Sequence, residues 1–478
     1  MAEAATPATH TLYEARRKIH PARVKGRFRS IKWAILAVTL AIYYLLPFVR
    51  WDRGPHEPSQ AVMIDLAHGR FYFFFIELWP QEVYYITGLL ILAAFTLFLM
   101  NAVAGRVWCG YLCPQTVWTD LFMAVEGFVE GDRRERIRLD AAPWTLDKIR
   151  RRVLKHGIWL IVAWWTGGAW VLYFADAPTL VVQLATFEAP NIAYVSIGIL
   201  TFTTYTLAGI MREQVCTYMC PWPRIQGALT DEDSLNITYR YNRGEPRGSA
   251  KKNAALREQG LPAGDCVDCV QCVTVCPVGI DIRDGMQLEC IQCGLCIDAC
   301  DAVMAKVGRP TRLIAYDTDL NVKRRQRGEA PVIRFVRART VLYGLLIAGV
   351  GLAILTALAL RTFTGLSAIH DRNPIHVTLA DGSIRNGYTL RILNKRPVER
   401  HFTLAVEGLS GARIEVPGAE SEDDRAAVRA APDDTHEIRA LVFAPAGARL
   451  DKSTPITFRI VDQASGESAH ANDFFKAP

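Results

Sequence analysis

The chain has 478 residues, of which 50% are hydrophobic, and its formal net charge is +7. That length allows several domains. The basic residues cluster beside apolar runs, which is typical of membrane topology rather than of a nucleic-acid surface, so we expect no nucleic-acid partner. The composition is also segregated: all 11 Trp residues lie within residues 1–222, and all 12 Cys residues lie between Cys109 and Cys300.

Five apolar runs approach or reach the roughly 20 residues that a membrane-spanning helix needs. They cover residues 32–50, 83–104, 158–175, 192–211 and 341–360, to the nearest residue or two. The first run follows a basic arm and is long enough to span, so we interpret it as an anchor and not as a cleaved signal peptide. The aromatic stretch from Phe71 to Trp79 is too short to span. We expect it to lie at the membrane interface or to pack inside the helix bundle.

The connections between these runs alternate in their content of Lys and Arg. The N-terminal arm, counted through Lys32, carries eight, whereas residues 52–82 carry only two. Residues 105–157 carry ten, residues 176–191 carry none, and residues 212–340 are again rich. The positive-inside rule therefore predicts a multi-pass protein of a bacterial inner membrane, with a cytoplasmic N-terminus and a periplasmic C-terminal domain.

Two motifs of the form C-x-Y-x-C-P follow the second and fourth apolar runs, one starting at Cys109 and the other at Cys216. Residues four apart share a helix face, and a proline disfavours the helical conformation of the residue before it. Each pair is therefore expected at a helix end near the cytoplasmic interface. The motifs indicate an internal repeat, and an axis along the membrane normal would bring four thiols together. These are the thiols of Cys109, Cys113, Cys216 and Cys220.

Four converging thiolates would form a tetrahedral soft-ligand site, which suits Cu(I), zinc or a mononuclear iron. Zinc would be structural, and iron would extend an electron path into the membrane. Copper could be held as Cu(I), with Met219 as a further thioether ligand. The alternative is that the four cysteines are small buried hydrophobic residues without a metal. The residues leave the identity of the metal open.

The strongest chemical signal is a pair of C-x2-C-x2-C-x3-C runs, one from Cys266 to Cys276 and one from Cys290 to Cys300. This spacing is typical of bacterial two-cluster ferredoxins, in which the fourth cysteine of each run binds the other cluster. The predicted ligands are Cys266, Cys269, Cys272 and Cys300 for one [4Fe–4S] cluster, and Cys290, Cys293, Cys296 and Cys276 for the other. Two complete runs disfavour zinc, and a cytoplasmic location disfavours disulfides. No substrate pocket is evident, so the two clusters are interpreted as an electron path.

Residues 361–478 contain short alternating runs separated by turn signals such as Asp381-Gly382 and Asn386-Gly387. This pattern predicts an immunoglobulin-like sandwich, which we interpret as a docking module without a catalytic constellation. The whole chain is thus predicted to be a multi-domain membrane protein with a five-helix transmembrane bundle. A two-cluster bacterial ferredoxin-like α+β domain is inserted before the last span, and a C-terminal all-β immunoglobulin-like sandwich follows that span. The expected segments are a cytoplasmic basic arm at 1–31, a four-helix membrane domain at 32–211, a cytoplasmic ferredoxin-like domain at 212–340, a fifth transmembrane helix at 341–360 and a periplasmic domain at 361–478.

With these motifs in place, nearly the whole chain resembles the FixG/RdxA/CcoG family of membrane iron–sulfur accessory proteins of cbb-type cytochrome c oxidase assembly. The resemblance is carried by "RFYFFFIELWPQE", "RVWCGYLCPQTVWTDLF", "REQVCTYMCPWPRIQGALTDEDSL", the two ferredoxin runs and "HDRNPIHVTLADGSIRNGYTLRILNK". The ferredoxin runs alone are generic, and the C-x-x-x-C-P motifs are shared with other membrane electron-transfer subunits. The order of the domains, with the β-domain at the end, distinguishes this family from those other electron-transfer subunits and is the order found in this chain.

The resemblance implies that the protein reduces Cu(II) to Cu(I) and supplies copper for the copper–haem centre of the oxidase. It implies two [4Fe–4S] clusters on the eight cysteines named above, and a copper role for the four membrane cysteines. Expected partners are copper ions, oxidase subunits or copper chaperones, membrane lipid and a cytoplasmic electron donor of unknown identity. Two alternatives stay open: a membrane electron conduit to another quinol-linked or periplasmic reductase, and an assembly scaffold whose clusters sense the redox state.

Overall fold

The structure is a computed structural model that describes residues 18–54, 57–396, 398–422, 424–448 and 450–478. Residues 1–17 of the predicted basic arm lie outside the described residues, and so do its Arg16 and Arg17. The chain forms two compact units. The first comprises residues up to Val49 and Gln60–Ile354, and the second comprises Arg50–Ser59 and Leu355–Pro478.

In the described part of the first unit, four helices are long and apolar enough to cross a membrane. These are α1 with its following turn (Arg27–Phe48), α2 with its preceding turn (Pro80–Ala104), α8 with the π-helical turns that continue it (Asn191–Met211), and α15 (Ala338–Ala359). Most of their surface is not covered by protein; for example, Leu90 on α2 is 67% exposed. Exposing such apolar side chains to water is unfavourable in free energy, whereas contact with lipid chains is not. The protein is therefore a membrane protein by the length and composition of these helices.

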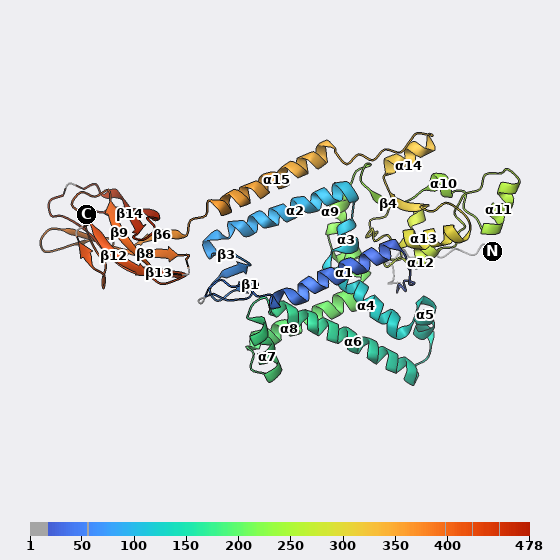
Figure 1. Ribbon diagram of the computed structural model, residues 1–478, viewed down its shortest axis with the longest axis horizontal. Coiled ribbons are helices and arrows are strands. Elements are labelled where there is room, and N and C mark those ends of the chain that lie inside the picture. The colour runs from blue at the N-terminus through green and yellow to red at the C-terminus, as the bar shows by residue number, and fades with distance from the viewer. Residues whose placement is uncertain (1–17, 55–56, 397, 423, 449) are drawn as a thin grey trace, which may run out of the picture. The chain divides into compact units, whose positions relative to one another are not determined.

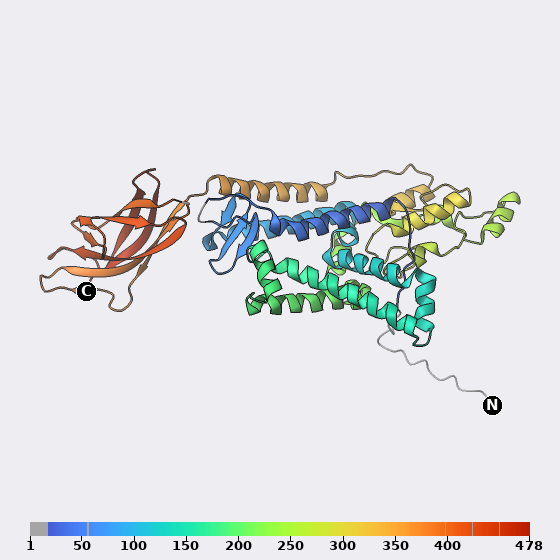
Figure 2. The same ribbon diagram turned by 60° about the horizontal axis from the view of Figure 1, so that its bottom comes forward.

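The α2 and α15 helices run side by side within the first unit (Figures 1 and 2). The rings of Phe98 and Tyr343 lie 6.0 Å apart, and a Cβ on Gly351 would lie 3.6 Å from the Leu92 side chain. Small residues let the two helices approach closely, which is the usual basis of helix packing in a bilayer.

The predicted span at 158–175 falls within the longer helix α6 (Leu146–Val171), which begins in a strongly basic sequence. Its apolar half is interrupted by glycines and carries four Trp residues, so it is less apolar than the four spans above. The helix packs along α8, and Trp159 is almost fully buried against Phe122 with its ring stacked at 5.4 Å. The membrane span predicted at 158–175, and hence the five-helix bundle, stays a prediction.

The aromatic stretch from Phe71 to Trp79 is largely extended, and its location at the membrane interface or inside the bundle stays a prediction. It forms two strands of a three-stranded antiparallel sheet with the order β1-β2-β3. The strands are β1 (Val62–Asp65), β2 (Arg70–Phe73) and β3 (Ile76–Leu78). Aromatic residues favour strands, and the turn at Gly69, which has a φ of 69°, reverses the chain between β1 and β2.

The shorter helices of the membrane part connect these spans. They are α3 (Val107–Tyr111), α4 (Pro114–Glu130), α5 (Arg133–Ala141), α7 (Ala177–Thr186) and α9 (Trp222–Leu229). Two π-helical segments, Tyr205–Met211 and Val215–Met219, lie between α8 and α9. Such turns are rare and often mark functional sites.

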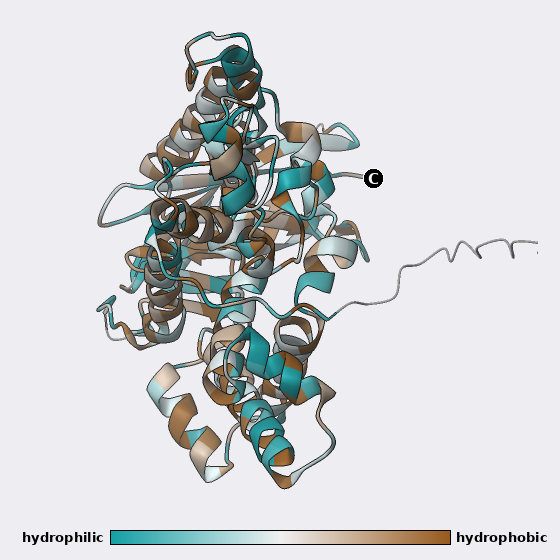
Figure 3. Cartoon of the chain, turned by 90° about the vertical axis from the view of Figure 1, so that its right-hand side faces the viewer, coloured by the Kyte–Doolittle hydropathy of each residue, from teal (hydrophilic) through white to brown (hydrophobic). Residues whose placement is uncertain are grey.

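The ferredoxin segment is a small α+β structure around a two-stranded antiparallel sheet of β4 (Asn236–Tyr239) and β5 (Ile314–Asp317). Its helices are α10 (Tyr241–Gly244), α11 (Ala250–Glu258), α12 (Gln271–Thr274), α13 (Leu295–Lys306) and α14 (Asp319–Gln326). The sheet packs with α13 around Ile237, Ile297 and Ile314, together with several of the cysteines. Figure 3 looks onto the end of the molecule that carries α11 and α14, where hydrophilic residues (teal) gather on the helices.

The second unit has two antiparallel sheets, and the immunoglobulin-like fold predicted from the sequence is confirmed. One sheet has the order β10-β13-β8-β6, with β7 also paired to β8, and the other has the order β11-β12-β9-β14-β15. The strands are β6 (Thr364–His370), β7 (Val377–Thr378), β8 (Ile384–Asn394), β9 (Arg400–Glu407), β10 (Arg413–Glu415), β11 (Ser421–Glu422), β12 (Arg425–Ala430), β13 (Asp434–Ala444), β14 (Ser453–Asp462) and β15 (Ser468–Lys476). The core between them contains Tyr388, Phe402, Phe458 and Phe475.

A buried charged group ties the ends of three strands in this second unit. The Arg400 guanidinium donates to the Asp462 carboxylate at 2.8 Å, to the Thr364 hydroxyl at 2.7 Å and to Glu467 at 2.9 Å. Arg400 is only 4% exposed, so loss of its main partner would leave a buried cation uncompensated. Although burial opposes the effect, hydrogen bonds from Ser465 and Arg400 lower the pKa of Asp462 to about 2.

We expect Asp462→Asn to destabilise the second unit by about 3 kcal/mol, because it removes one of the two carboxylates that pair with buried Arg400 and leaves only Glu467, which is more exposed. Hydrogen exchange of the β9 and β14 amides in the full chain measures this loss. Glu407→Gln is the matched control, since the Glu407–Arg459 pair is about half exposed on both sides and should contribute less than about 1 kcal/mol. The difference between wild type and Asp462→Asn should shrink as the pH falls from about 4 towards 2, where Asp462 itself becomes protonated. Equal effects of the two substitutions would contradict the assignment.

Candidate metal and electron-transfer centre

The cysteines of the ferredoxin segment form two separate groups. Cys266, Cys269, Cys272 and Cys300 line one pocket together with Tyr239, Arg283, Met304 and Leu313. Cys276, Cys290, Cys293 and Cys296 line a second pocket, which Cys272 also borders. Each group thus joins three cysteines of one run with the last cysteine of the other, as the cross-over pattern requires.

The chemistry of these two pockets fits iron–sulfur clusters. Each supplies four sulfur atoms, and neither is lined by a carboxylate or a histidine. Burial raises the pKa of Cys272 and Cys300 to about 12, so their thiols lose a proton only when a metal binds them. The assignment of individual cysteines to each cluster stays a prediction.

The four membrane cysteines lie around one cavity of about 280 Å³. The cavity is lined by Cys109, Cys113, Cys216 and Cys220, so the two C-x-Y-x-C-P motifs meet in space. Met219 is 56% exposed and is not one of the lining residues, so the predicted thioether ligand lies away from the cavity. The cavity is also lined by Leu288, Glu289 and Cys290 from the ferredoxin segment.

The two motifs have matching backbone geometry at their second cysteine. Cys113 has φ −60° and ψ 126°, and Cys220 has φ −79° and ψ 121°, so both are extended, as the following prolines demand. Cys113 is the N-cap residue of α4, and Pro114 occupies its first turn. In each motif the helical segment that carries the first cysteine ends before the proline. The second cysteine therefore lies outside that helical segment.

The spacing of these four thiols differs from the predicted tetrahedral site. A tetrahedral ion with metal–sulfur bonds of about 2.3 Å holds its sulfur atoms only about 3.8 Å apart. Among the residues that the structure describes, no three cysteine Sγ atoms lie within 4.8 Å of one another. The four thiols share a cavity without this close spacing, and the metal that they hold stays a prediction.

Three polar residues that were not predicted from the sequence, Gln226, Asn101 and Arg106, lie at or behind the wall of this cavity. The Cys109 thiol donates a hydrogen bond to the Gln226 Oε1 at 3.1 Å, and the Gln226 side chain donates to Asn101 at 3.0 Å. Both Gln226 and Asn101 are fully buried. Burial raises the pKa of Cys109 to about 12, with neighbouring Cys113 and Cys216 adding to the effect. In the sequence, Asn101 could have been noticed as an amide side chain within an apolar span. Gln226 could have been noticed four residues after Trp222.

The third of these residues, Arg106, joins the cavity to the ferredoxin segment. It is 6% exposed, its backbone N–H donates to Gln292 at 2.9 Å, and its guanidinium donates to the carbonyls of Leu288, Cys290 and Pro223. It therefore places a positive charge between Cys109 and the loop that carries Cys290.

The backbone of the two segments also makes close contact at Gly110. A Cβ at this position would lie 2.7 Å from the Ile291 carbonyl oxygen and 3.1 Å from the Cys293 Cα. The neighbouring Tyr111 hydroxyl donates to the Cys293 carbonyl at 2.9 Å. The first C-x-Y-x-C-P motif is thus packed directly on the loop of the second ferredoxin run, and two of the three residues between its cysteines, Gly110 and Tyr111, make that contact.

These features define a membrane-bound iron–sulfur protein in which a cysteine cavity at the end of the membrane helices adjoins a two-cluster ferredoxin segment. Comparison with known families agrees with this class. One family model, described as "4Fe-4S dicluster domain", matches residues 211–319, and another, described as "4Fe-4S binding domain", matches residues 86–129. A third, described as "IG-like fold at C-terminal of FixG", matches residues 354–478.

The chain belongs to the family of the FixG and Rdx proteins. It is 50% identical to "Nitrogen fixation protein FixG" of Rhizobium meliloti, over 98% of this chain and 93% of that protein. It is 49% identical to "Protein RdxA" of Cereibacter sphaeroides, over 95% of each chain, and 48% identical to "Protein RdxB" of the same organism, over 98% of each. A solved structure of a FixG-related protein from Vibrio parahaemolyticus covers 24% of this chain with 21% identity and a TM-score of 0.21.

Iron content should separate the two kinds of cysteine. We expect about eight iron atoms per chain in the wild type and about four in Cys266→Ala or Cys290→Ala, because each substitution removes a ligand of one cluster. The variant Thr217→Ala, which sits beside Cys216 but offers no ligand, is the matched control and should keep the wild-type iron content. Iron and acid-labile sulfide analysis of the purified full chain measures this. Wild-type content in both cysteine variants would contradict the two-cluster assignment.

Proposed function

We propose that this protein is a membrane cupric reductase that converts Cu(II) into Cu(I) for the assembly of a cbb-type cytochrome c oxidase. Its membership of the FixG and Rdx family and its iron–sulfur domains make it a redox protein. The observation that carries the proposal is the shared cavity: Cys290, a predicted cluster ligand, lines the same space as the four membrane cysteines. Electrons that reach the ferredoxin segment can therefore pass to a metal ion held by those cysteines.

The chemistry of the cavity favours the reduced ion. Thiolates are soft ligands that bind Cu(I) in preference to Cu(II), so a cysteine-lined site draws the reduction forward. When bound, the iron–sulfur clusters store and pass electrons one at a time, which matches the single electron that Cu(II) accepts. The electron comes from a cytoplasmic reductant, and each transfer yields one Cu(I). Arg106 keeps a positive charge beside Cys109 and Cys290, which stabilises the extra negative charge of a reduced site.

The distribution of Lys and Arg supports one orientation for this reaction. The ferredoxin segment and the ends of the helices that carry the cysteine pairs are strongly basic and belong on the cytoplasmic side of a bacterial inner membrane. The immunoglobulin-like domain then lies in the periplasm. It offers a surface for oxidase subunits or copper chaperones.

Copper reduction by the full chain is the direct test. We expect protein with both clusters to reduce Cu(II) when dithionite is the electron donor, and Cys266→Ala and Cys290→Ala to lose most of that activity. The double variant Cys109→Ser/Cys216→Ser should keep about eight iron atoms but lose at least about tenfold in rate, because it removes one thiolate from each pair. Formation of the Cu(I)–bicinchoninate complex follows the reaction.

The variant Met219→Leu is the matched control for this test, because Met219 lies next to Cys220 without lining the cavity. It should reduce copper at the wild-type rate. Absence of copper reduction by cluster-replete wild type would overturn the proposal. Full oxidase assembly in cells that carry Cys266→Ala or Cys290→Ala would instead favour a scaffold.

The contact at Gly110 provides a test that removes no ligand. We expect Gly110→Ala to keep the wild-type iron content and to slow copper reduction, because the added methyl group pushes the first cysteine motif away from the Ile291 and Gln292 backbone. Gly198→Ala is the matched control, since a Cβ there meets nothing within 4 Å. Stopped-flow absorbance of the pre-reduced protein mixed with Cu(II) measures the rate. Equal rates in the two variants would show that this contact does not set the electron path.

A further inference from the structure

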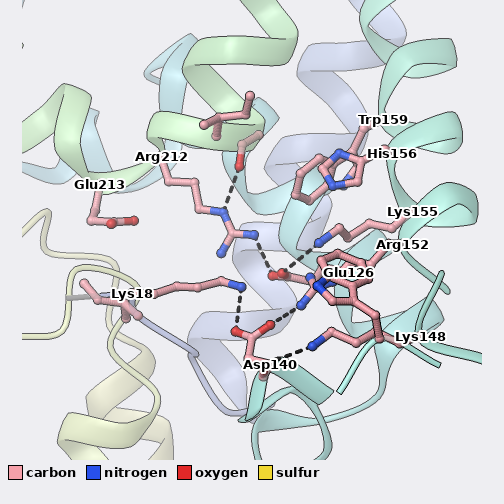
Figure 4. A pocket seen from close by; sticks show the side chains of 14 residues that line it. Lys18, Glu126, Asp140, Lys148, Arg152, Lys155, His156, Trp159, Arg212 and Glu213 are labelled. Carbon is pink, nitrogen blue, oxygen red and sulfur yellow. Dashed lines mark hydrogen bonds and ion pairs between the residues drawn. The ribbon is translucent and has the colours of Figure 1, made fainter. Parts of the chain in front are cut away.

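A second cavity of the first unit, of about 640 Å³, has no part in the proposed redox chemistry. It lies among α4, α5, the basic first half of α6 and the π-helical segment at 205–211. Its lining includes Lys18, Lys148, Arg152, Lys155 and Arg212, and Figure 4 shows these basic side chains pointing toward one space.

The charged side chains at this cavity form one continuous network. At its centre Glu126, which is fully buried, pairs with Arg136 at 3.0 Å, with Arg212 at 2.7 Å and with Lys155 at 3.7 Å. Although burial opposes the effect, Arg212, Lys155 and Arg136 lower the pKa of Glu126 to about 2, so it is ionised.

The network continues through two further carboxylates. Lys155 also pairs with Glu130 at 2.9 Å, and Arg152 pairs with Glu130 at 2.9 Å. Arg152 and Lys18 then share the Asp140 carboxylate, the latter at 2.6 Å. Burial lowers the pKa of His20, the remaining neighbour of Asp140, so it adds no charge near neutral pH.

Among the residues that the structure describes, the charges of this network do not balance. Its cations are Lys18, Arg136, Arg152, Lys155 and Arg212, and its carboxylates are Glu126, Glu130 and Asp140. The remaining charged residues of the lining, Lys148 and Glu213, cancel each other. Lys18 is 46% exposed, but the other four cations are at most 16% exposed, so this excess of positive charge favours a bound anion.

One of the cations also has an unused donor. The Arg212 Nε donates to the Gly209 carbonyl at 3.1 Å and one terminal nitrogen donates to Glu126 at 2.7 Å. Within the described residues its other terminal nitrogen has no hydrogen-bond partner, and Figure 4 shows it on the side of the cavity that faces Lys18. Arginine with a free edge beside lysines is a common arrangement for binding a phosphate.

We propose that this cavity binds a phosphate group, carried by an anionic lipid headgroup or by a free phosphate. A phosphodiester supplies one negative charge and a phosphomonoester nearly two, which matches the excess of the network. Trp144, which lines the cavity and is 74% exposed, and the 84% exposed Leu146 beside it suit the headgroup region of a membrane, and this side of the membrane is the expected cytoplasmic side.

The position of Arg212 gives the bound phosphate a structural consequence. Arg212 has a φ of 48° and separates the two π-helical segments, the second of which carries Cys216. Its carbonyl accepts a hydrogen bond from Gln115 at 3.2 Å, and Gln115 follows the Cys113-Pro114 pair. A phosphate that holds the Arg212 side chain therefore stiffens the segment between the two cysteine motifs.

Phosphate-dependent stabilisation of the full chain tests this site. The protein is freed of bound lipid in a neutral detergent, and thermal unfolding is followed by Trp fluorescence with inorganic phosphate, or with NaCl at equal ionic strength. We expect phosphate to raise Tm by more than about 2 °C and NaCl not to do so, since a ligand that binds only the folded state stabilises it. A parallel arm places the protein in nanodiscs of phosphatidylcholine with or without phosphatidylglycerol. Stabilisation by phosphatidylglycerol alone assigns the site to a lipid, and stabilisation by inorganic phosphate alone assigns it to a free anion.

The variant Lys18→Gln removes one cation that is 46% exposed and so leaves the buried part of the network intact. We expect it to weaken phosphate binding by about fivefold in a calorimetric titration. Lys251→Gln, an exposed lysine on α11 that does not line the cavity, is the matched control and should bind as the wild type does. No stabilisation by either probe, or equal weakening by both variants, would overturn the proposal.

Discussion

The arrangement of the redox centre depends on one close contact between backbones, that of residues 105–111 with the ferredoxin loop at 288–293. Gly105 has a φ of 53°, and a Cβ there would collide with the side chains of Asn236 and Gln292. Gly110 allows the Ile291 carbonyl to approach, and Arg106 then donates to the carbonyls of the same loop. This contact keeps the loop that carries Cys290 at the cavity of the membrane cysteines.

Much of this centre could be predicted from the sequence, because the cysteine spacings impose it. The C-x2-C-x2-C-x3-C runs require the last cysteine of each run to cross over, and the two pockets join Cys300 with the first run and Cys276 with the second. The prolines after Cys113 and Cys220 require an extended residue, and both residues are extended. The repeat of the motif predicted that the four thiols would face one another, and they line one cavity.

Other features depend on contacts between distant residues and could not be predicted. Gln226 supports Cys109 across 117 residues, and no local pattern marks a glutamine as the partner of a thiol. The spacing of the four thiols depends on how α3 lies relative to the π-helical segment Val215–Met219, so a motif alone cannot distinguish a closed mononuclear site from an open cavity. The strand conformation of the aromatic stretch also depends on contacts with other segments, because β1, β2 and β3 pair with one another and the apolar side chains alone do not indicate that pairing.

The two cavities of the first unit have separate proposed roles: one binds a metal ion on the electron path, and the other binds an anion that stabilises the structure. One gathers soft sulfur ligands beside the second ferredoxin run, and the other gathers an uncompensated positive charge beside the segment that leads to Cys216. Because Gln115 and Arg212 are hydrogen-bonded between them, a change in either cavity can reach the other.

The central claim is that electrons leave the ferredoxin segment through the cysteine cavity to copper. A single-turnover experiment on the reduced, desalted full chain measures it most directly, by following cluster absorbance and Cu(I) formation together after mixing with excess Cu(II). We expect cluster oxidation and Cu(I) formation to share one rate constant, with about two Cu(I) formed per chain, one for each cluster. Clusters that stay reduced in the presence of Cu(II), or Cu(I) that forms without cluster oxidation, would contradict it.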